Sequence, residues 1–236
     1  LMEVVPHGAW IARIEAEARS RRMTPRSVLD LCCGTGIGSR ILLERGYRPV
    51  VGVDASAPMV ARARQLSTAG DGSVFVCADA GDFELGDARF DMAVSLFDSL
   101  NYILDEDHLL RVFKQVRCHL LPGALFAFDM NSIHALKTGM FTQSDQTPRL
   151  RHEWISHWDE QSSLCTVEMD FWITAPAGGG ESHFREVHRQ RGWASGHVAD
   201  LLRTAGFVQT QIYGNYGYRS PRSRSDRWLF TTQVPS

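Results

Sequence analysis

The chain has 236 residues, a formal net charge of −2, 44% hydrophobic residues and 22% charged residues, values typical of one large globular domain. So small a net charge excludes bulk attraction to nucleic acid or acidic membranes. No apolar stretch reaches the roughly 20 residues of a membrane span, and the first residues lack the pattern of a signal peptide. We therefore expect a soluble, cytoplasmic protein that binds neither nucleic acid nor membranes.

The five cysteines are odd in number, and no two of them form a Cys-x-x-Cys pair. Cys32 and Cys33 are adjacent, and neighbours in sequence rarely pair with each other. Several of the cysteines lie in apolar runs. This pattern favours reduced, buried thiols over a disulfide framework.

Apolar residues at helical spacing predict a first helix over residues 9–22. Short apolar runs then alternate with helical segments as far as residue 129. This alternation favours right-handed βαβ units and a doubly wound parallel sheet. The predicted strands are 28–32, 49–53, 74–77, 91–96 and 124–129, and the predicted helices between them are 39–45, 57–66 and 108–120.

Residues 150–191 interrupt this rhythm, because hydrophobic and polar residues alternate there in three runs with turns at 159–162 and 176–180. They predict an inserted antiparallel sheet. A helix over 194–204 and an antiparallel pair of strands, 208–213 and 228–232, complete the chain. We divide it into an α/β core, residues 1–149 and 192–236, and an inserted subdomain, residues 150–191.

The strongest motif is a glycine-rich turn after the first predicted strand. The strand ends at Asp30, the turn contains Gly34 and Gly36, and the next strand ends at Asp54. Glycines allow positive φ and close approach of a ligand to the backbone. A carboxylate at the end of the second strand can accept hydrogen bonds from two ribose hydroxyls. The motif therefore predicts a nucleotide site.

Two kinds of nucleotide fit such a turn. The dinucleotide fingerprint requires a third glycine, but Ser39 follows Gly34 and Gly36. Asp30 would also face a pyrophosphate unfavourably. S-adenosylmethionine has an ammonium group and a sulfonium and no phosphate, so the acidic strand end favours this ligand over a nicotinamide dinucleotide.

The segment from Asp30 to Gly36 resembles the first motif of class I S-adenosylmethionine-dependent methyltransferases. Asp54, the pair Asp79-Ala80, the strand at 90–95 and the turn at 120–124 follow in that family's order. The resemblance covers residues 28–130 and, more loosely, 194–232. It implies a seven-stranded, mostly parallel sheet of order 3-2-1-4-5-7-6, with the donor bound where strands 1 and 4 diverge.

The segment from Asp98 to Tyr102, together with the inserted sheet, resembles bacterial small-molecule methyltransferases, including N,N-dimethyltransferases of deoxy-amino sugars. In that subgroup an aromatic residue three positions before an N-terminal Trp covers the donor. His7 occupies this position before Trp10. The cofactor implied is S-adenosyl-L-methionine, and the predicted donor-binding residues are His7, Trp10, Asp30, Cys32, Gly34, Thr35, Gly36, Asp54, Ala55, Met59, Asp79, Ala80, Ser95 and Phe97.

The candidate catalytic residues are Asp98 and Asn101, which follow the fourth strand of the core, and His188 in the insert. The third strand of the insert places Glu186, His188 and Gln190 on one face and Arg185, Arg189 and Arg191 on the other. Trp154, Trp158 and Trp172 share one parity, so we expect the insert to form a wall or roof of the acceptor pocket.

His188 is a candidate to orient or deprotonate the acceptor, because an unperturbed imidazole titrates near neutrality. The alternative is a histidine that only hydrogen-bonds across the sheet, and Asp98 has the alternative of capping the segment after it. The histidines lack the close spacing of metal ligands, so we predict no metal site. The arginines in the loop 219–227 are typical of a solvated hairpin tip, with a substrate phosphate or carboxylate as the alternative partner.

These observations predict methyl transfer by direct SN2 displacement to a nitrogen or oxygen atom of a small metabolite. Two alternatives stay open. One is an enzyme that uses the same donor for non-methyl chemistry, and the other is a non-catalytic nucleotide-binding protein on the same fold.

Overall fold

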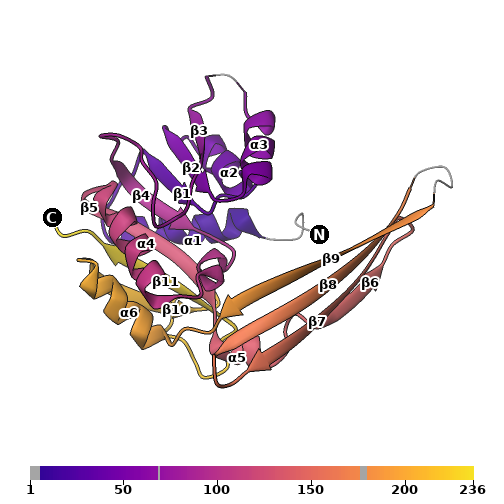
Figure 1. The fold of residues 1–236 in the computed structure, drawn as a ribbon. Coiled ribbons are helices and arrows are strands. Elements are labelled where there is room, and N and C mark those ends of the chain that lie inside the picture. The colour runs from indigo at the N-terminus through magenta and orange to yellow at the C-terminus, as the bar shows by residue number, and fades with distance from the viewer. Residues whose placement is uncertain (1–5, 69, 176–179) are drawn as a thin grey trace.

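In the computed structural model of the protein, which describes residues 6–68, 70–175 and 180–236, a central sheet of seven strands carries the core (Figure 1). Its order, β10-β11-β5-β4-β1-β2-β3, confirms the predicted order 3-2-1-4-5-7-6. The strands β1 to β5 run parallel, and β11 pairs antiparallel with both β5 and β10. The strands are β1 (Val28–Leu31), β2 (Val50–Asp54), β3 (Ser73–Cys77), β4 (Phe90–Ser95), β5 (Leu120–Asn131), β10 (Val208–Gly214) and β11 (Arg227–Gln233).

Helices cover both faces of this sheet, because its central strands β1 and β2 are apolar except for Asp30 and Asp54 and direct successive side chains to opposite faces. Leu29 and Leu31 pack on one face against α4 (Glu106–Cys118) and α6 (Ser195–Thr204). Val28 packs on the other face against α1 (His7–Ser20) and α2 (Ile37–Glu44). Full burial of each such side chain contributes about 1.5–3 kcal/mol.

The helix boundaries follow local capping signals. Helix α4 begins two residues before the predicted residue 108, because the side chain of Asp105 accepts a hydrogen bond from the backbone N–H of His108 and caps the first turn. Helix α2 likewise begins earlier than predicted, directly after Gly36. Helix α3 (Ala57–Leu66) matches its prediction and packs on Phe75 of the edge strand β3.

The insert forms a second sheet of order β6-β7-β8-β9 that projects from the core as a long arm (Figure 1). Its strands are β6 (Gln143–Gln146), β7 (Leu150–Asp159), β8 (Leu164–Thr174) and β9 (Glu181–Arg191). A short helix, α5 (Ile133–Lys137), links it to β5. The sequence predicted three strands and omitted β6, whose four residues are all polar and exposed. Of the predicted turn at 176–180, residues 176–179 lie outside the described residues.

The register of the second sheet assigns its side chains to two faces. On β9, Glu186, His188 and Gln190 share one face, as predicted, and their partners on β8 are Met169, Val167 and Cys165. We call this the inner face because it contacts the core, and the opposite one the outer face.

One prediction about these faces is wrong. Trp154 and Trp158 lie on the inner face, but Trp172 pairs with Arg151 and His183 on the outer face. The hairpin register aligns even-numbered residues of β7 with odd-numbered residues of β8, so equal parity on two strands does not mean a shared face.

The thiols are all free, but only Cys165 is buried. The prediction of buried thiols is therefore wrong for Cys77, at the end of the edge strand β3, and for Cys118, at the end of α4. Within the described part of the chain, no helix is long and apolar enough to cross a membrane.

Candidate active site

The glycine-rich turn lies between β1 and α2, at the carboxyl edge of the central sheet. Gly34 and Gly36 adopt φ values of 55° and 76°, which favour glycine. A Cβ atom on Gly36 would lie 3.0 Å from the ring of Phe75. The turn therefore depends on glycine for both its backbone conformation and its packing.

Asp54 at the end of β2 holds the glycine-rich turn in place. One carboxylate oxygen accepts a hydrogen bond from the backbone N–H of Gly34 at 2.8 Å, and the other accepts one from Ser56 at 2.8 Å. The side chain is half-buried. The turn and the end of β2, 20 residues apart in the sequence, are thus joined at the position predicted to bind a ribose.

Asp30 is a nearly buried carboxylate at the end of β1. The hydroxyl of Ser39 donates a 2.5 Å hydrogen bond to it, so the residue that replaces the third glycine is the partner of the acid. Burial, together with the negative charge of Asp54, raises the pKa of Asp30 to about 6. A cationic ligand group beside Asp30 would favour its charged form, as predicted for the amino-acid part of the donor.

The two cysteines after β1 do not have the character of nucleophiles. Burial, and then the charges of Asp54 and Asp30, raise the pKa of Cys32 to about 12. Burial also raises the pKa of Cys33. Because the thiolate is the reactive form, these side chains act as small groups that line the turn.

The predicted adenine side lies after β3. Asp79 accepts hydrogen bonds from the backbone N–H of Gly81 at 2.8 Å and from Nε2 of His108 at 2.7 Å. Burial raises the pKa of Asp79, but these two bonds outweigh it, and the net pKa is lowered. Met59 is half-exposed, and its sulfur lies 3.7 Å from where a Cβ atom of Gly34 would stand.

The turn after β4 is built on two consecutive left-handed residues that are not glycine. Phe97 and Asp98 have φ values of 63° and 51°. Their backbone N–H groups donate to the two carboxylate oxygens of Asp129, at 2.7 and 3.1 Å. Asp129 is fully buried at the end of β5, so a buried acid holds an unfavourable backbone conformation beside the end of β4.

Arg227 at the start of β11 is the cation of this cluster. It forms a 2.7 Å ion pair with Asp98 and also pairs with Asp129. The remaining oxygen of Asp98 accepts a 2.6 Å hydrogen bond from Gln190 of β9. Burial raises the pKa of Asp98, although Arg227 opposes the shift. Both oxygens of Asp98 are therefore engaged in a network between the core and the second sheet.

Aromatic side chains of α1 and of the β10–β11 loop cover this turn. Trp10 stacks on Tyr216 with ring centres 4.9 Å apart and lies 6.1 Å from the ring of Phe97. His7 lies 5.6 Å from Trp10 and 6.1 Å from Phe97. The structure thus brings together three of the residues predicted to bind the donor.

Asn101 joins three segments of the chain. Its amide nitrogen donates to the carbonyl oxygens of Asn131 and Arg191, at 3.2 and 2.9 Å, and its amide oxygen accepts from the backbone N–H of Asn131 at 2.8 Å. The residue is fully buried in the 3₁₀-helix η2 (Ser99–Tyr102). Asn101 therefore fixes where the second sheet leaves the core.

His188 lies on the inner face beside the core. Its Nδ1 atom is 3.0 Å from the hydroxyl of Tyr102, and its Nε2 atom is 3.1 Å from the carboxylate of Glu186. The imidazole is about one-third exposed, at 31%. Burial and the charge of Asp98 raise the pKa of Tyr102 to about 12. Tyr102, His188 and Glu186 thus form a chain of polar groups from the turn after β4 towards solvent.

The sequence analysis missed five residues of this site, because their importance lies in long-range contacts. Arg227 was assigned to a solvated loop, whereas its side chain is only 15% exposed; Arg219, Arg222 and Arg224 are exposed as expected. Only Asp129 had a local signal in the sequence, because it is an acid near the end of β5, as Asp30 is near the end of β1. The missed residues are Tyr102, Asp129, Gln190, Tyr216 and Arg227.

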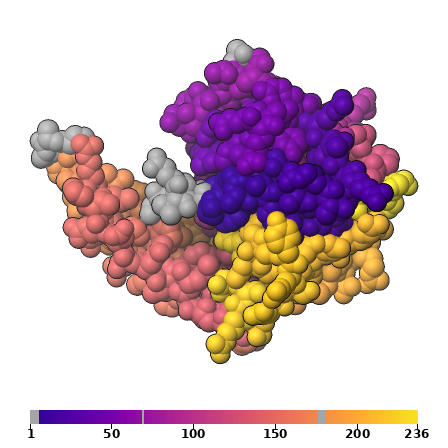
Figure 2. All heavy atoms as spheres, turned by 180° about the vertical axis from the view of Figure 1, so that it is seen from behind, coloured from indigo at the N-terminus to yellow at the C-terminus, as the bar shows by residue number. Residues whose placement is uncertain are grey.

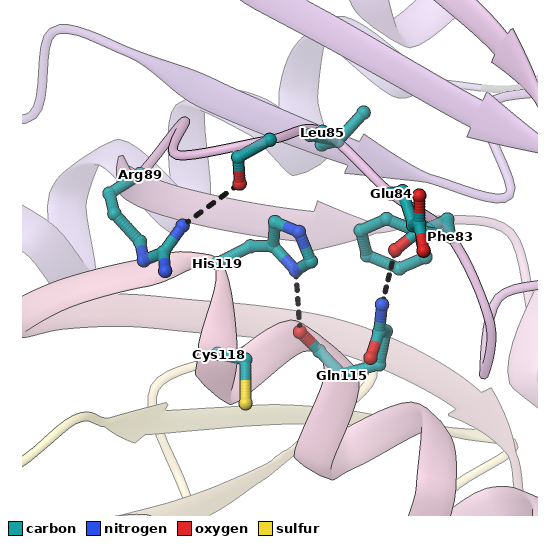
Figure 3. A pocket seen from close by; sticks show the side chains of 8 residues that line it. Phe83, Glu84, Leu85, Arg89, Gln115, Cys118 and His119 are labelled. Carbon is teal, nitrogen blue, oxygen red and sulfur yellow. Dashed lines mark hydrogen bonds between the residues drawn. The ribbon is translucent and has the colours of Figure 1, made fainter.

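A pocket of about 320 Å³ lies elsewhere. It is lined by residues of the loop before β4 and of the end of α4, including Phe83, Arg89 and His119 (Figure 3). This position is at the amino ends of β4 and β5, whereas ligands of open α/β sheets bind at the carboxyl ends. Among the residues that the structure describes, no group of three or more His, Cys, Asp or Glu side chains is arranged to hold a metal ion.

Comparisons with known proteins agree with this geometry. A family model described as a methyltransferase domain matches residues 28–123. The chain is 28% identical to YqeM of Bacillus subtilis, whose name assigns it to the methyltransferases, over 99% of this chain and 92% of that protein.

Two solved structures share the fold over almost the whole chain. An S-adenosylmethionine-dependent methyltransferase from Clostridium acetobutylicum superposes with a TM-score of 0.88 at 22% identity, over 99% of this chain and 94% of that one. CalS10 of Micromonospora echinaspora, an amino pentose methyltransferase with its donor bound, superposes with a TM-score of 0.73 at 18% identity, over 98% of this chain and 92% of that one.

Proposed function

Because the chain belongs to the S-adenosylmethionine-dependent methyltransferases, we propose that it methylates a nitrogen or oxygen atom of a small metabolite by direct SN2 displacement. The acceptor binds between the carboxyl edge of the central sheet and the inner face of the second sheet. The observation that carries this proposal is the contact of His188 and Gln190 with Tyr102 and Asp98, which joins the inner face to the turn after β4.

The proposed donor site uses the residues around the glycine-rich turn. Asp54 accepts hydrogen bonds from the ribose, Asp79 and Ala80 adjoin the adenine, and Asp30 faces the amino-acid part. The residues present fit a cationic donor, because Asp30 is a buried carboxylate with a raised pKa whose side-chain partner is a neutral hydroxyl. When bound, S-adenosylmethionine supplies an electrophilic methyl group. His7, Trp10 and Phe97 exclude water from the donor.

The proposed catalytic group is His188. A nitrogen nucleophile that accepts a methyl group acquires a positive charge and must lose a proton, and an oxygen nucleophile must lose one as it attacks. His188 takes up this proton, and Glu186 stabilises the resulting imidazolium. Asp98 contributes a fixed negative potential near the acceptor, and Asn101 positions the second sheet. Alignment of donor and acceptor contributes the largest part of the lowering of the activation barrier, up to about 7–11 kcal/mol in favourable cases.

The test compares two histidines on opposite faces of β9. His188→Ala should lower the turnover of an acceptor at least tenfold while the affinity for S-adenosylmethionine, measured by calorimetry, stays unchanged. His183→Ala is the control, because His183 pairs with Asp170 on the outer face. Wild-type turnover in the His188 variant would mean that this residue only forms a hydrogen bond across the sheet and takes no part in catalysis.

Mass spectrometry of the donor product separates the alternative functions. S-adenosylhomocysteine formed together with a methylated acceptor supports the proposal. Methylthioadenosine would indicate non-methyl chemistry. An intact donor after incubation with extracts of small metabolites would favour a non-catalytic binding protein.

A further inference from the structure

The outer face of the second sheet is internally paired. Arg185 forms a two-point ion pair with Asp170, at 2.8 and 3.0 Å, and His183 lies 2.7 Å from the same carboxylate. The guanidinium of Arg151 lies 3.6 Å from the centre of the Trp172 ring. These charged and aromatic groups thus have partners within the sheet, as expected for a solvated surface.

Both faces leave aliphatic side chains exposed, among them Ile155 and Val187 on the outer face, but the inner face also exposes a pair of stacked phenylalanine rings. Phe184 of β9 stacks on Phe171 of β8 with ring centres 4.9 Å apart, yet Phe184 is 41% exposed and Ile173 beside them is 42% exposed. A sheet that only faced water would not need this surface. Figure 2 shows the outer part of the arm standing away from the core.

The apolar patch is continuous with the proposed reaction site along one strand. From the core outwards, β9 presents Gln190, His188, Glu186 and Phe184 on the inner face. At about 3.3 Å per residue, the six residue steps from Gln190 to Phe184 span roughly 20 Å. Polar groups therefore lie at the core end of a long wall, and aromatic rings lie at its outer end.

The charge of the inner face is of one sign. Among the described residues of β6 to β9, those on the inner face include the acids Asp145 and Glu186 and neither Lys nor Arg. All four arginines of β7 and β9, Arg151, Arg185, Arg189 and Arg191, lie on the outer face. A phosphate group requires cationic or clustered N–H donors, so this wall disfavours phosphorylated ligands.

We propose that the acceptor is an elongated amine that carries a flat apolar group and no phosphate. Its ammonium group is attracted by Glu186 and loses one proton to solvent water, which leaves the neutral amine as the nucleophile. Its apolar group lies on Phe171 and Phe184. The neutral nitrogen then forms a bond to the methyl carbon while the carbon–sulfur bond breaks and its electron pair remains on sulfur. The extra proton on nitrogen passes to His188. This inference rests on the proposed function.

The test is a fluorescence titration of the full-length protein, saturated with S-adenosylhomocysteine, with dansylcadaverine, a primary amine joined to a naphthalene group by a five-carbon chain. We expect saturable binding that weakens about tenfold in Phe184→Ala, because an exposed aromatic stack is lost. Trp172→Ala is the matched control on the other face of the same sheet and should change the affinity less than twofold. A dansyl probe of equal length that ends in a phosphate should bind at least tenfold more weakly than the amine.

Several results would overturn the inference. They are the absence of saturable binding, equal losses in the two variants, and tighter binding of the phosphate probe. Sedimentation that shows a dimer broken by Phe184→Ala would assign the patch to a second copy of the chain instead. The titration needs no turnover, so it tests the inference separately from the proposed function. If the probe does not bind but the protein still forms S-adenosylhomocysteine with a short polar acceptor, the proposed function stands. Probe binding without methyl transfer to any acceptor would contradict the proposed function instead.

Discussion

Replacing Arg227 with methionine tests whether the buried ion cluster supports the active site. The change removes a cation that pairs with both Asp98 and Asp129, whose exposed fractions are 4% and 0%. Breaking a buried pair by removing one partner costs about 3–5 kcal/mol, because the other charge stays buried without compensation. We expect the free energy of unfolding at pH 7.5 to fall by about this amount, measured by urea denaturation.

The same variant has a predicted pH dependence. Arg227 lowers the pKa of Asp98, so its removal raises the folded-state pKa of this acid further above the unfolded value. The folded variant then binds a proton that the unfolded chain does not, and its stability rises as the pH falls between the two values. The deficit relative to the wild type should therefore shrink from pH 7.5 to pH 5.

Arg222→Met is the control, because Arg222 lies exposed in the same loop and should change stability by less than about 0.5 kcal/mol. The reasoning is refuted if Arg227→Met costs less than about 1 kcal/mol at pH 7.5, or if its deficit grows at lower pH. Either result would mean that Asp98 and Asp129 are stable without their cation.

Three further substitutions test the donor site. Asp54→Ala should weaken S-adenosylmethionine binding about ten- to a hundredfold in calorimetry, since hydrogen bonds to a charged acceptor contribute about 1.5–3 kcal/mol; an unchanged affinity in a folded variant would contradict the ribose assignment. Gly36→Val should abolish donor binding, because φ is 76° and Phe75 is too close, and normal binding would place the donor elsewhere. Asp30→Asn should raise the stability of the donor-free protein at pH 7 by up to about 3 kcal/mol, because a raised folded pKa makes stability fall as pH rises from 3.8 to 6, and a variant with the wild-type pH profile would refute this.

The geometry of the proposed nucleotide end of the site was predictable because its signals are local. A buried strand that ends in Asp30, two glycines with positive φ and a second strand that ends in Asp54 lie within 25 residues of sequence. In a parallel sheet, strand order and direction bring such strand ends to one edge, so a linear pattern was sufficient to locate them. The alternation of strands and helices determined the core for the same reason.

The acceptor end depended on contacts that no local pattern encodes. The charge of Arg227 is paired only because β11 inserts next to β5, which places the arginine beside Asp98 and Asp129. The face on which Trp172 lies followed from the register of one hairpin, and a shift of one residue would have reversed it. Residue types and periodicity determine which groups a strand presents, but only the packed sheet decides what each group meets.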